Sequence, residues 1–78
     1  MWQEHDNKLK KKFEFKNFEE AFGFMTKVAA VAEALNHHPY WINDYNKLDI
    51  WLSTHDKGNV VTEKDRTLAK AIDGLMKQ

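Results

Sequence analysis

The sequence predicts an α+β sandwich, in which two helices cover one face of a four-stranded antiparallel sheet in the chain order β-β-α-β-β-α. Residues 9–15 and 47–53 alternate apolar and polar side chains, as half-buried strands do. Residues 18–35 and the stretch after Thr62 follow helix-capping residues and have helical apolar spacing. Because the chain has only 78 residues, we expect one small domain, residues 1–78, with a single core.

The N-terminal part of the chain is expected to form a hairpin. Residues 2–5 suit a short strand, and Asp6-Asn7 suits a tight turn because both residue types tolerate the left-handed backbone. In the next strand one side carries Leu9, Lys11, Phe13 and Phe15, and the other carries Lys10, Lys12, Glu14 and Lys16. The local excess of lysine consists of Lys8, Lys10, Lys11 and Lys12, and we interpret it as the solvated side of a strand rather than as a phosphate-binding patch.

A long helix is expected over residues 18–35. Asn17 suits its N-cap, and Glu20 falls at the capping-box spacing. The helix carries two apolar stripes, one of Phe18, Phe22, Met25, Ala29 and Ala32, the other of Ala21, Phe24, Val28, Val31 and Leu35. Together they are wider than one sheet contact needs, so the second surface either fills the small core or meets a partner helix. We favour the partner helix, since small domains gain stability by association.

The chain turns where this helix stops. Asn36 suits the left-handed conformation that ends many helices, and Pro39 biases His38 toward an extended backbone. The pair His37-His38 is therefore expected at a turn of fixed geometry and low burial.

Two further strands and a second helix should follow. Residues 40–45 suit a short strand or extended loop, and residues 47–53 a half-buried strand with Leu48, Ile50 and Leu52 on one side. After a turn at residues 56–59, Thr62 and Asp65 have the spacing of a capping box. The apolar side of the last helix consists of Leu68, Ala71, Ile72, Leu75 and Met76.

Composition limits the class of function. The 12 basic and 12 acidic side chains cancel, which gives no electrostatic footprint for direct nucleic-acid or membrane binding. The absence of cysteine excludes disulfides, thiol nucleophiles and zinc–thiolate sites. No apolar run approaches the roughly 20 residues of a membrane span, and the N-terminus lacks a signal-peptide pattern. We expect a soluble cytoplasmic protein, also nuclear if its source is a eukaryote.

Three of the four histidines are the candidate functional residues, namely His37, His38 and His55. Imidazoles can donate and accept protons near neutral pH, so converging histidines favour acid–base chemistry over uninvolved loop residues. In an extended segment the adjacent pair points apart, so at most one of the two faces a given ligand squarely. A zinc site is less favoured, because adjacency does not give the same-face spacing of a helical ligand pair. The chain has neither a Gly-rich phosphate loop nor a serine elbow.

The ordered motifs resemble those of a known family. Glu33-Ala34-Leu35-Asn36-His37-His38-Pro39, then Tyr45-Asn46-Lys47 and Leu52-Ser53-Thr54-His55, are similar to the signature of the pterin-4a-carbinolamine dehydratases. The resemblance extends to residues 13–18 and 21–25 upstream, and to residues 62–65 and Leu68-Ala69 downstream. It covers nearly the whole chain and is more specific than the His-His-Pro triplet alone.

This resemblance implies an enzyme that removes water from 4a-hydroxytetrahydropterin to give quinonoid dihydropterin, in tetrahydrobiopterin recycling. It implies no metal or cofactor, and a homodimer or homotetramer to which the long helix contributes. In vertebrates the family also supplies a dimerisation cofactor of a homeodomain transcription factor. The rival hypothesis is an interaction protein that binds such a partner through the long helix without catalysis. The three histidines favour the enzyme.

By matching position, the resemblance makes His37, His38 and His55 the active-site histidines. We assign acid–base work to His37 and His55, and an orienting role to His38. The substrate-binding residues expected around them are Glu33, Asn36, Pro39, Trp41, Thr54 and Asp65. For Trp41, stacking on the pterin and forming a hydrophobic wall or subunit contact are equally favoured.

The chain departs from the family at several points. Family members generally have another helix before Trp2, and Asn36 stands where an aspartate often precedes the histidines. The loop 56–61 is slightly longer, with Val60-Val61 in place of Gly and one apolar residue. Trp51 occupies an outward strand position, which indicates a covered surface. Strand alternation would also place His55 away from the core, so either the strand ends before Thr54 or the pocket opens at the sheet edge.

Overall fold

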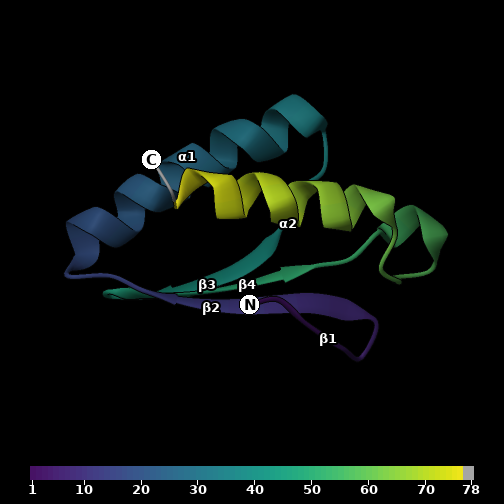
Figure 1. Ribbon diagram of the computed structural model, residues 1–78, viewed down its shortest axis with the longest axis horizontal. Helices are drawn as coiled ribbons and strands as arrows, with labels where there is room; N and C mark the ends of the chain where they lie inside the picture. The colour runs from purple at the N-terminus through teal and green to yellow at the C-terminus, as the bar shows by residue number, and fades with distance from the viewer. Residues whose placement is uncertain (77–78) are drawn as a thin grey trace.

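The structure, a computed structural model, describes residues 1–76 and has the predicted order of strands and helices (Figure 1). The strands are β1 (Gln3–His5), β2 (Lys8–Glu14), β3 (Tyr40–Asp44) and β4 (Lys47–Leu52). The helices are α1 (Phe18–Leu35) and α2 (Glu63–Leu75), with a 3-10 turn at His55–Lys57. The sheet order is β1-β2-β4-β3, every neighbouring pair is antiparallel, and both helices lie on the same face. The predicted α+β fold class is confirmed.

Local sequence signals set most of these boundaries. Asp6 and Asn7 have φ angles of 51° and 62°, the left-handed geometry that a two-residue hairpin turn requires. The Asn17 side chain accepts a hydrogen bond from the Glu20 N–H at 2.9 Å, which confirms the predicted N-cap of α1. Thr62 and Asp65 complete the predicted capping box of α2. The β2 and β4 strands each end one residue earlier than predicted.

The core lies between the sheet and the helices. Its members are the inward apolar side chains of the two central strands and both helices: Leu9, Phe13, Phe24, Val28, Ala32, Leu48, Ile50, Leu52, Leu68, Ala69 and Ile72. Of the two α1 stripes, Ala21, Phe24 and Val28 are buried, whereas Phe18 and Phe22 remain about half exposed. The apolar surface of α1 is therefore wider than the core that it covers, as the sequence indicates.

The end of β4 settles the position of the loop that follows it. β4 stops at Leu52, and Thr54 then pairs with Val60 in an isolated antiparallel bridge. Between them, the 3-10 turn carries His55 and closes at Gly58, whose φ is 85°. Of the two alternatives for His55, the strand therefore ends before Thr54.

Candidate active site

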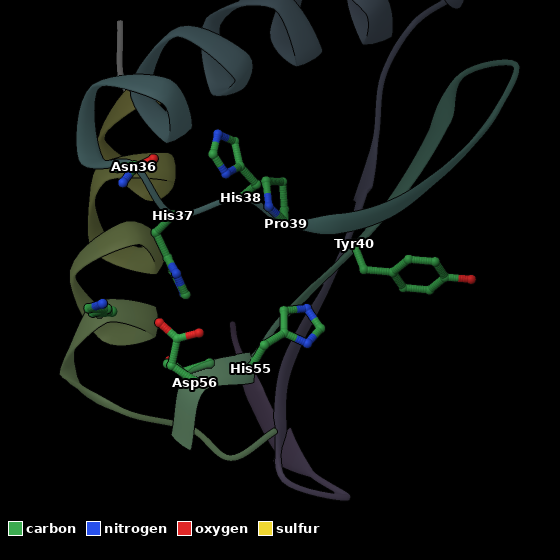
Figure 2. Close-up of a pocket in the computed structure, with 9 residues that line it drawn as sticks. Asn36, His37, His38, Pro39, Tyr40, His55 and Asp56 are labelled. Carbon is green, nitrogen blue, oxygen red and sulfur yellow. The ribbon is translucent and has the colours of Figure 1, made fainter. Parts of the chain in front are cut away.

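A cavity of about 410 Å³ opens where the C-terminal end of α1 meets the loop after β4 (Figure 2). All three predicted catalytic histidines line it, although they come from two separate turns of the chain. Its full lining is Asn36, His37, His38, Pro39, Tyr40, Thr54, His55, Asp56 and Lys64. The structure thus brings together the histidines that the sequence placed apart.

The end of α1 fixes the backbone of the histidine pair. Asn36 adopts the left-handed conformation with φ 53°, and its N–H donates to the Glu33 carbonyl at 3.1 Å. The His37 N–H reaches back to the Ala32 carbonyl at 3.0 Å. This pair of bonds is a Schellman motif, which satisfies helix-end carbonyls and holds the next residue against the helix. His37 is therefore positioned by the helix itself rather than by a loose loop.

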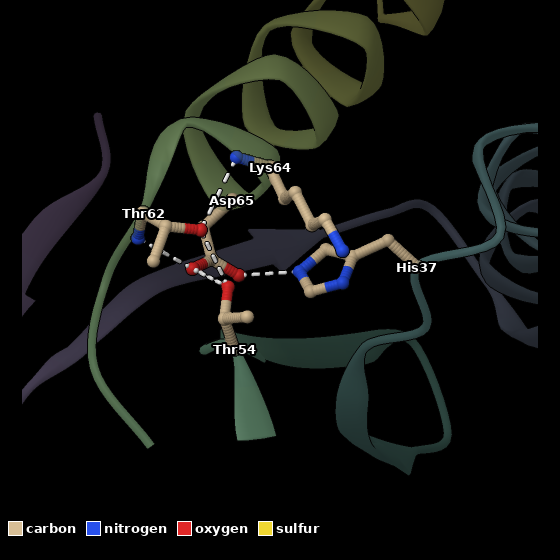
Figure 3. A network of polar contacts seen from close by, with 5 residues as sticks. All are labelled: His37, Thr54, Thr62, Lys64 and Asp65. Atoms are coloured by element: carbon tan, nitrogen blue, oxygen red, sulfur yellow. Dashed lines mark hydrogen bonds and ion pairs between the residues drawn. The ribbon is translucent and has the colours of Figure 1, made fainter. Parts of the chain in front are cut away.

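The His37 ring is held by the buried carboxylate of Asp65. Its Nε2 lies 2.6 Å from Asp65 Oδ1, and the two side chains are 12% and 0% exposed. The second carboxylate oxygen, Oδ2, accepts the Thr54 hydroxyl at 2.8 Å and the Thr62 N–H at 2.9 Å (Figure 3). A buried polar group needs such partners, and Asp65 has them on both oxygens. The capping acid of α2 is thus also the anchor of a histidine.

The hydroxyls around Asp65 have a consistent proton direction. Thr54 has one hydroxyl proton and gives it to Asp65, so Thr62 must donate in the 2.6 Å contact between the two hydroxyls. Thr62 Oγ1 in turn accepts from the Lys64 N–H at 3.3 Å. In this arrangement the Asp65 carboxylate acts only as an acceptor. Its Oδ1 atom therefore accepts a hydrogen bond from His37 Nε2, which must carry the proton. The Nδ1 atom of His37 is then the one left for proton exchange.

His38 and His55 have more open surroundings. His38 Nε2 pairs with Glu33 Oε1 at 2.8 Å, and both side chains are well exposed. Exposed pairs of this kind contribute little stability, so Glu33 orients His38 only loosely. His55 is exposed on its 3-10 turn, and Figure 2 places its ring between Asp56 and Tyr40. The three imidazoles therefore differ in both orientation and exposure: His37 is held by a buried carboxylate, whereas His55 is exposed to solvent.

Three of the six predicted substrate-binding residues line the cavity and three do not. Asn36, Pro39 and Thr54 line the cavity, and Asp65 lies behind it through His37 and Thr54. Glu33 reaches the site only through His38. Trp41 does not line this cavity but packs against the core, opposite Ile50 in the sheet. For Trp41 the hydrophobic-wall alternative fits this placement, because its strand position turns the ring toward the helices.

Three cavity residues were not predicted, namely Tyr40, Asp56 and Lys64. Asp56 follows His55 in the 3-10 turn, and its side chain is among those that line the cavity in Figure 2. Lys64 precedes Asp65 in the first turn of α2, and Figure 3 shows its side chain extending toward His37. Adjacency to a predicted site residue was the available signal for both. Within residues 1–76, no group of three His, Asp or Glu side chains is arranged to hold a metal ion.

Comparison with known proteins identifies the family. The model of the pterin 4 alpha carbinolamine dehydratase family matches residues 1–75. A protein of Prochlorococcus marinus named for this dehydratase is 55% identical over 74 residues, which are 95% of this chain and 76% of that protein. A Rhodospirillum rubrum protein of the same name is 56% identical over 68 residues, or 87% and 70% of the two chains. The chain belongs to the pterin 4 alpha carbinolamine dehydratase family, whose name denotes a hydro-lyase.

Two solved structures share the fold. The crystal structure of a transcriptional coactivator/pterin dehydratase from Brucella melitensis has a TM-score of 0.89 and 43% identity, covering 95% of this chain and 80% of that one. A pterin dehydratase-like protein, identified as a RuBisCO assembly factor in the alpha-carboxysome, has a TM-score of 0.76 and 25% identity. That match covers 96% of this chain and 86% of the other.

Among residues 1–76, no helix is long and apolar enough to span a membrane.

Proposed function

We propose that this protein dehydrates 4a-hydroxytetrahydropterin to quinonoid dihydropterin by histidine acid–base catalysis. The observation that carries the proposal is the cavity in which His37, braced by buried Asp65, faces the same space as His38 and His55. Acid–base catalysis needs proton carriers within reach of one ligand and held in a defined orientation. Membership of the dehydratase family selects the pterin carbinolamine as that ligand.

The reaction balances with two proton transfers. A proton goes to the 4a-hydroxyl oxygen, the C4a–O bond breaks, and water leaves with the bonding electrons. The N5–H proton is removed, and its electron pair forms the N5=C4a double bond. One proton is delivered and one is removed, so the protein carries the same number of protons after the reaction and no redox partner is needed. The acid and the base then return to their starting protonation states by exchange with solvent. We assign these steps to His37 and His55, and substrate orientation to His38.

The geometry supports a division of labour between the two proton carriers. Because His37 donates from Nε2 to Asp65, its exchange of protons falls to Nδ1. His55 is exposed and has access to solvent, which suits a group that must regain or lose its proton each turnover. His38 is tied to an exposed Glu33, which suits an orienting group.

A direct assay tests the proposal. Chemically generated 4a-hydroxytetrahydropterin is mixed with the purified chain, and formation of the quinonoid product is followed by absorbance. We expect a rate proportional to protein concentration and above that of buffer alone. A rate equal to that of buffer would refute the dehydratase activity. Coupling to an aromatic amino acid hydroxylase would then test the proposed place in tetrahydrobiopterin recycling.

A second candidate function is the binding of a partner protein through α1. Phe18 and Phe22 stack on the outer side of this helix with ring centroids 5.7 Å apart, and Phe22 is 54% exposed. An exposed aromatic pair makes this side of α1 the candidate surface for association. The names of the two structural neighbours, a coactivator and an assembly factor, favour such a role. Affinity capture with wild-type protein and with a Phe22→Asp variant tests this role. A partner that binds through α1 should be captured by the wild type and should be missing from the capture with the variant.

We also propose that α1 joins copies of this chain into a homodimer or homotetramer. Such self-association would cover the exposed Phe18 and Phe22, which the core leaves open. The transcription-factor partner and the cytoplasmic location expected from the sequence stay predictions. Cell fractionation with an antibody to the chain checks the location.

A further inference from the structure

The catalytic cavity continues around the sheet edge onto the face that carries no helices. A second hollow of about 300 Å³ shares His38, Tyr40 and His55 with the cavity. A third hollow of about 320 Å³ adjoins it through Lys8, Tyr40 and Trp51. Figure 2 shows the Tyr40 ring pointing away from His37 and Asp56, toward this outer side. The site therefore opens into a groove, here called the outer groove, that runs from His55 to Trp51.

One wall of the outer groove is a row of side chains across three strands. Lys10, Trp51 and Tyr40 are direct neighbours in the sheet register. The Tyr40 and Trp51 rings lie 5.3 Å apart, and Lys10 Nζ sits 4.9 Å from the Trp51 ring centroid. An ammonium over an indole face is held in place by the ring quadrupole. The groove thus has an aromatic wall with a positioned cation beside it.

The charge of the outer groove is positive. Lys8 and Lys10 line it, and the ion pairs among residues 1–76 leave both without a carboxylate partner. Among residues 1–76, the one acid that lines it is Asp6, whose Oδ2 lies 3.3 Å from His5 Nε2, and the two lysines outnumber this carboxylate. Strand alternation places these lysines outside the core, and the sequence alone favours a solvated strand side over a phosphate-binding patch for them. The hollow and the aromatic wall, which depend on tertiary structure, give them a place to meet a ligand.

We propose that the outer groove is a specificity subsite for an anionic, phosphate-bearing substituent of the pterin ring. The inference rests on the proposed dehydratase function, since the ring itself would occupy the histidine cavity. A substituent leaving that cavity between His38 and His55 enters the groove beside Tyr40. Its linking atoms pack on Tyr40 and Trp51, and its phosphate meets Lys8 and Lys10. The groove thereby favours phosphorylated over neutral pterin side chains.

The experiment compares two 4a-hydroxytetrahydropterins that differ only in a phosphate on the side chain. We expect wild-type kcat/KM to be about tenfold higher for the phosphorylated substrate, the size of two partly exposed charge-assisted contacts. The preference should disappear in Lys8→Gln/Lys10→Gln and shrink as salt rises. The matched control is Lys12→Gln/Lys47→Gln, which removes the same charge from the same sheet and should keep the preference. Equal kcat/KM values in the wild type would overturn the proposal.

A binding measurement separates this proposal from the dehydratase activity. Calorimetry with the unreactive oxidised pterins, with and without the phosphate, needs no turnover. If the protein is inactive on both substrates, tighter binding of the phosphorylated form that Lys8→Gln/Lys10→Gln abolishes would still support the subsite. Equal binding would overturn it, as would inorganic phosphate alone competing as well as the phosphorylated pterin.

A variant of the aromatic wall gives an independent test. Trp51→Ser should lower several-fold the ratio of kcat/KM for the phosphorylated substrate to kcat/KM for a 6-methyl substrate. Sedimentation of the same variant shows whether the ring serves another purpose. If Trp51→Ser dissociates an oligomer while the substrate preference stays intact, a second copy covers this face and the subsite proposal is wrong.

Discussion

Asp65 and His37 are 28 positions apart in the sequence, yet the carboxylate Oδ1 lies 2.6 Å from the imidazole Nε2. The contact joins the first turn of α2 to the second residue after the end of α1. The same carboxylate closes the capping box of α2 through the Thr62 N–H. One buried side chain therefore serves helix stability and the orientation of a proposed proton carrier.

Replacement of Asp65 by Asn should weaken both roles. The Asn amide would present N–H groups where a carboxylate now accepts donors, which leaves a buried donor without a partner. We expect a loss of about 1–3 kcal/mol in the free energy of unfolding, measured with urea, together with a large fall in kcat. Glu63→Gln is the matched control, because Glu63 is an exposed acid in the same helical turn. Equal stability of the Asp65 variant and wild type would contradict the role of this network.

Replacement of His37 or His55 by Ala should lower kcat strongly. Loss of one general acid or base typically costs about 10²–10⁴-fold in rate. His55→Ala should retain wild-type stability, because His55 is exposed, and circular dichroism checks this. His5→Ala is the control, since His5 lies on the exposed N-terminal hairpin and contacts Asp6. Wild-type rates in both active-site variants would show that other groups carry the protons.

Replacement of Glu33 by Gln should have only a small effect. The pair with His38 is exposed on both sides, so its loss should change the free energy of unfolding by under about 1 kcal/mol. We expect KM to rise modestly with little change in kcat, as befits an orienting contact. A fall in kcat as large as that of His37→Ala would instead make His38 a proton carrier.

Substitutions at Asn36 test the helix end that presents His37. Asn36→Ala forces a Cβ-bearing residue without a local polar side chain into the left-handed region and should cost about 1 kcal/mol. Asn36→Gly, which suits this conformation, should stay within a few tenths of a kcal/mol of the wild type. Urea unfolding of the two variants side by side measures the difference. Equal stabilities would argue against a conformational role for this residue.

The exposed aromatic pair on α1 predicts self-association. Sedimentation should find a dimer or tetramer for the wild type and a smaller species for Phe22→Asp, because a charge in an apolar interface is poorly tolerated. Lys27→Glu, at an exposed position of α1 outside the apolar stripes, should leave the assembly unchanged. A wild-type protein that stays monomeric at high concentration would contradict the prediction.

Sequence reasoning succeeds where structure is local. The capping residues Asn17, Asn36 and Thr62 act on backbone groups within a few positions, so their types and spacing identify the helix ends. Strand alternation likewise predicts which side chains of β2 and β4 reach the core. These signals, taken with the family motif, were enough for the fold class and for the histidines that meet in the cavity.

The remaining features depend on tertiary contacts. The bond between Asp65 and His37 arises when α2 docks beside the end of α1, which no pattern within either segment encodes. The side to which Trp41 points depends on the register between β3 and β4, because a short strand of mixed polarity does not fix its own inward face. Lys64 and Asp56 were missed because charged residues beside a motif usually face solvent.

The bridge between Thr54 and Val60 also closes the loop of residues 55–59, which carries His55, at its base. The Thr54 N–H donates to the Val60 carbonyl at 2.9 Å, and the Asn59 N–H returns to the Thr54 carbonyl at 3.0 Å. Residues added or removed between these two ends change the loop tip while its base stays anchored beside Asp65. We expect these bonds to hold Thr54 in place when the loop has extra length. Changes in the sequence or length of this loop, in evolution or by design, should therefore alter one wall of the cavity while His37 and Asp65 keep their positions.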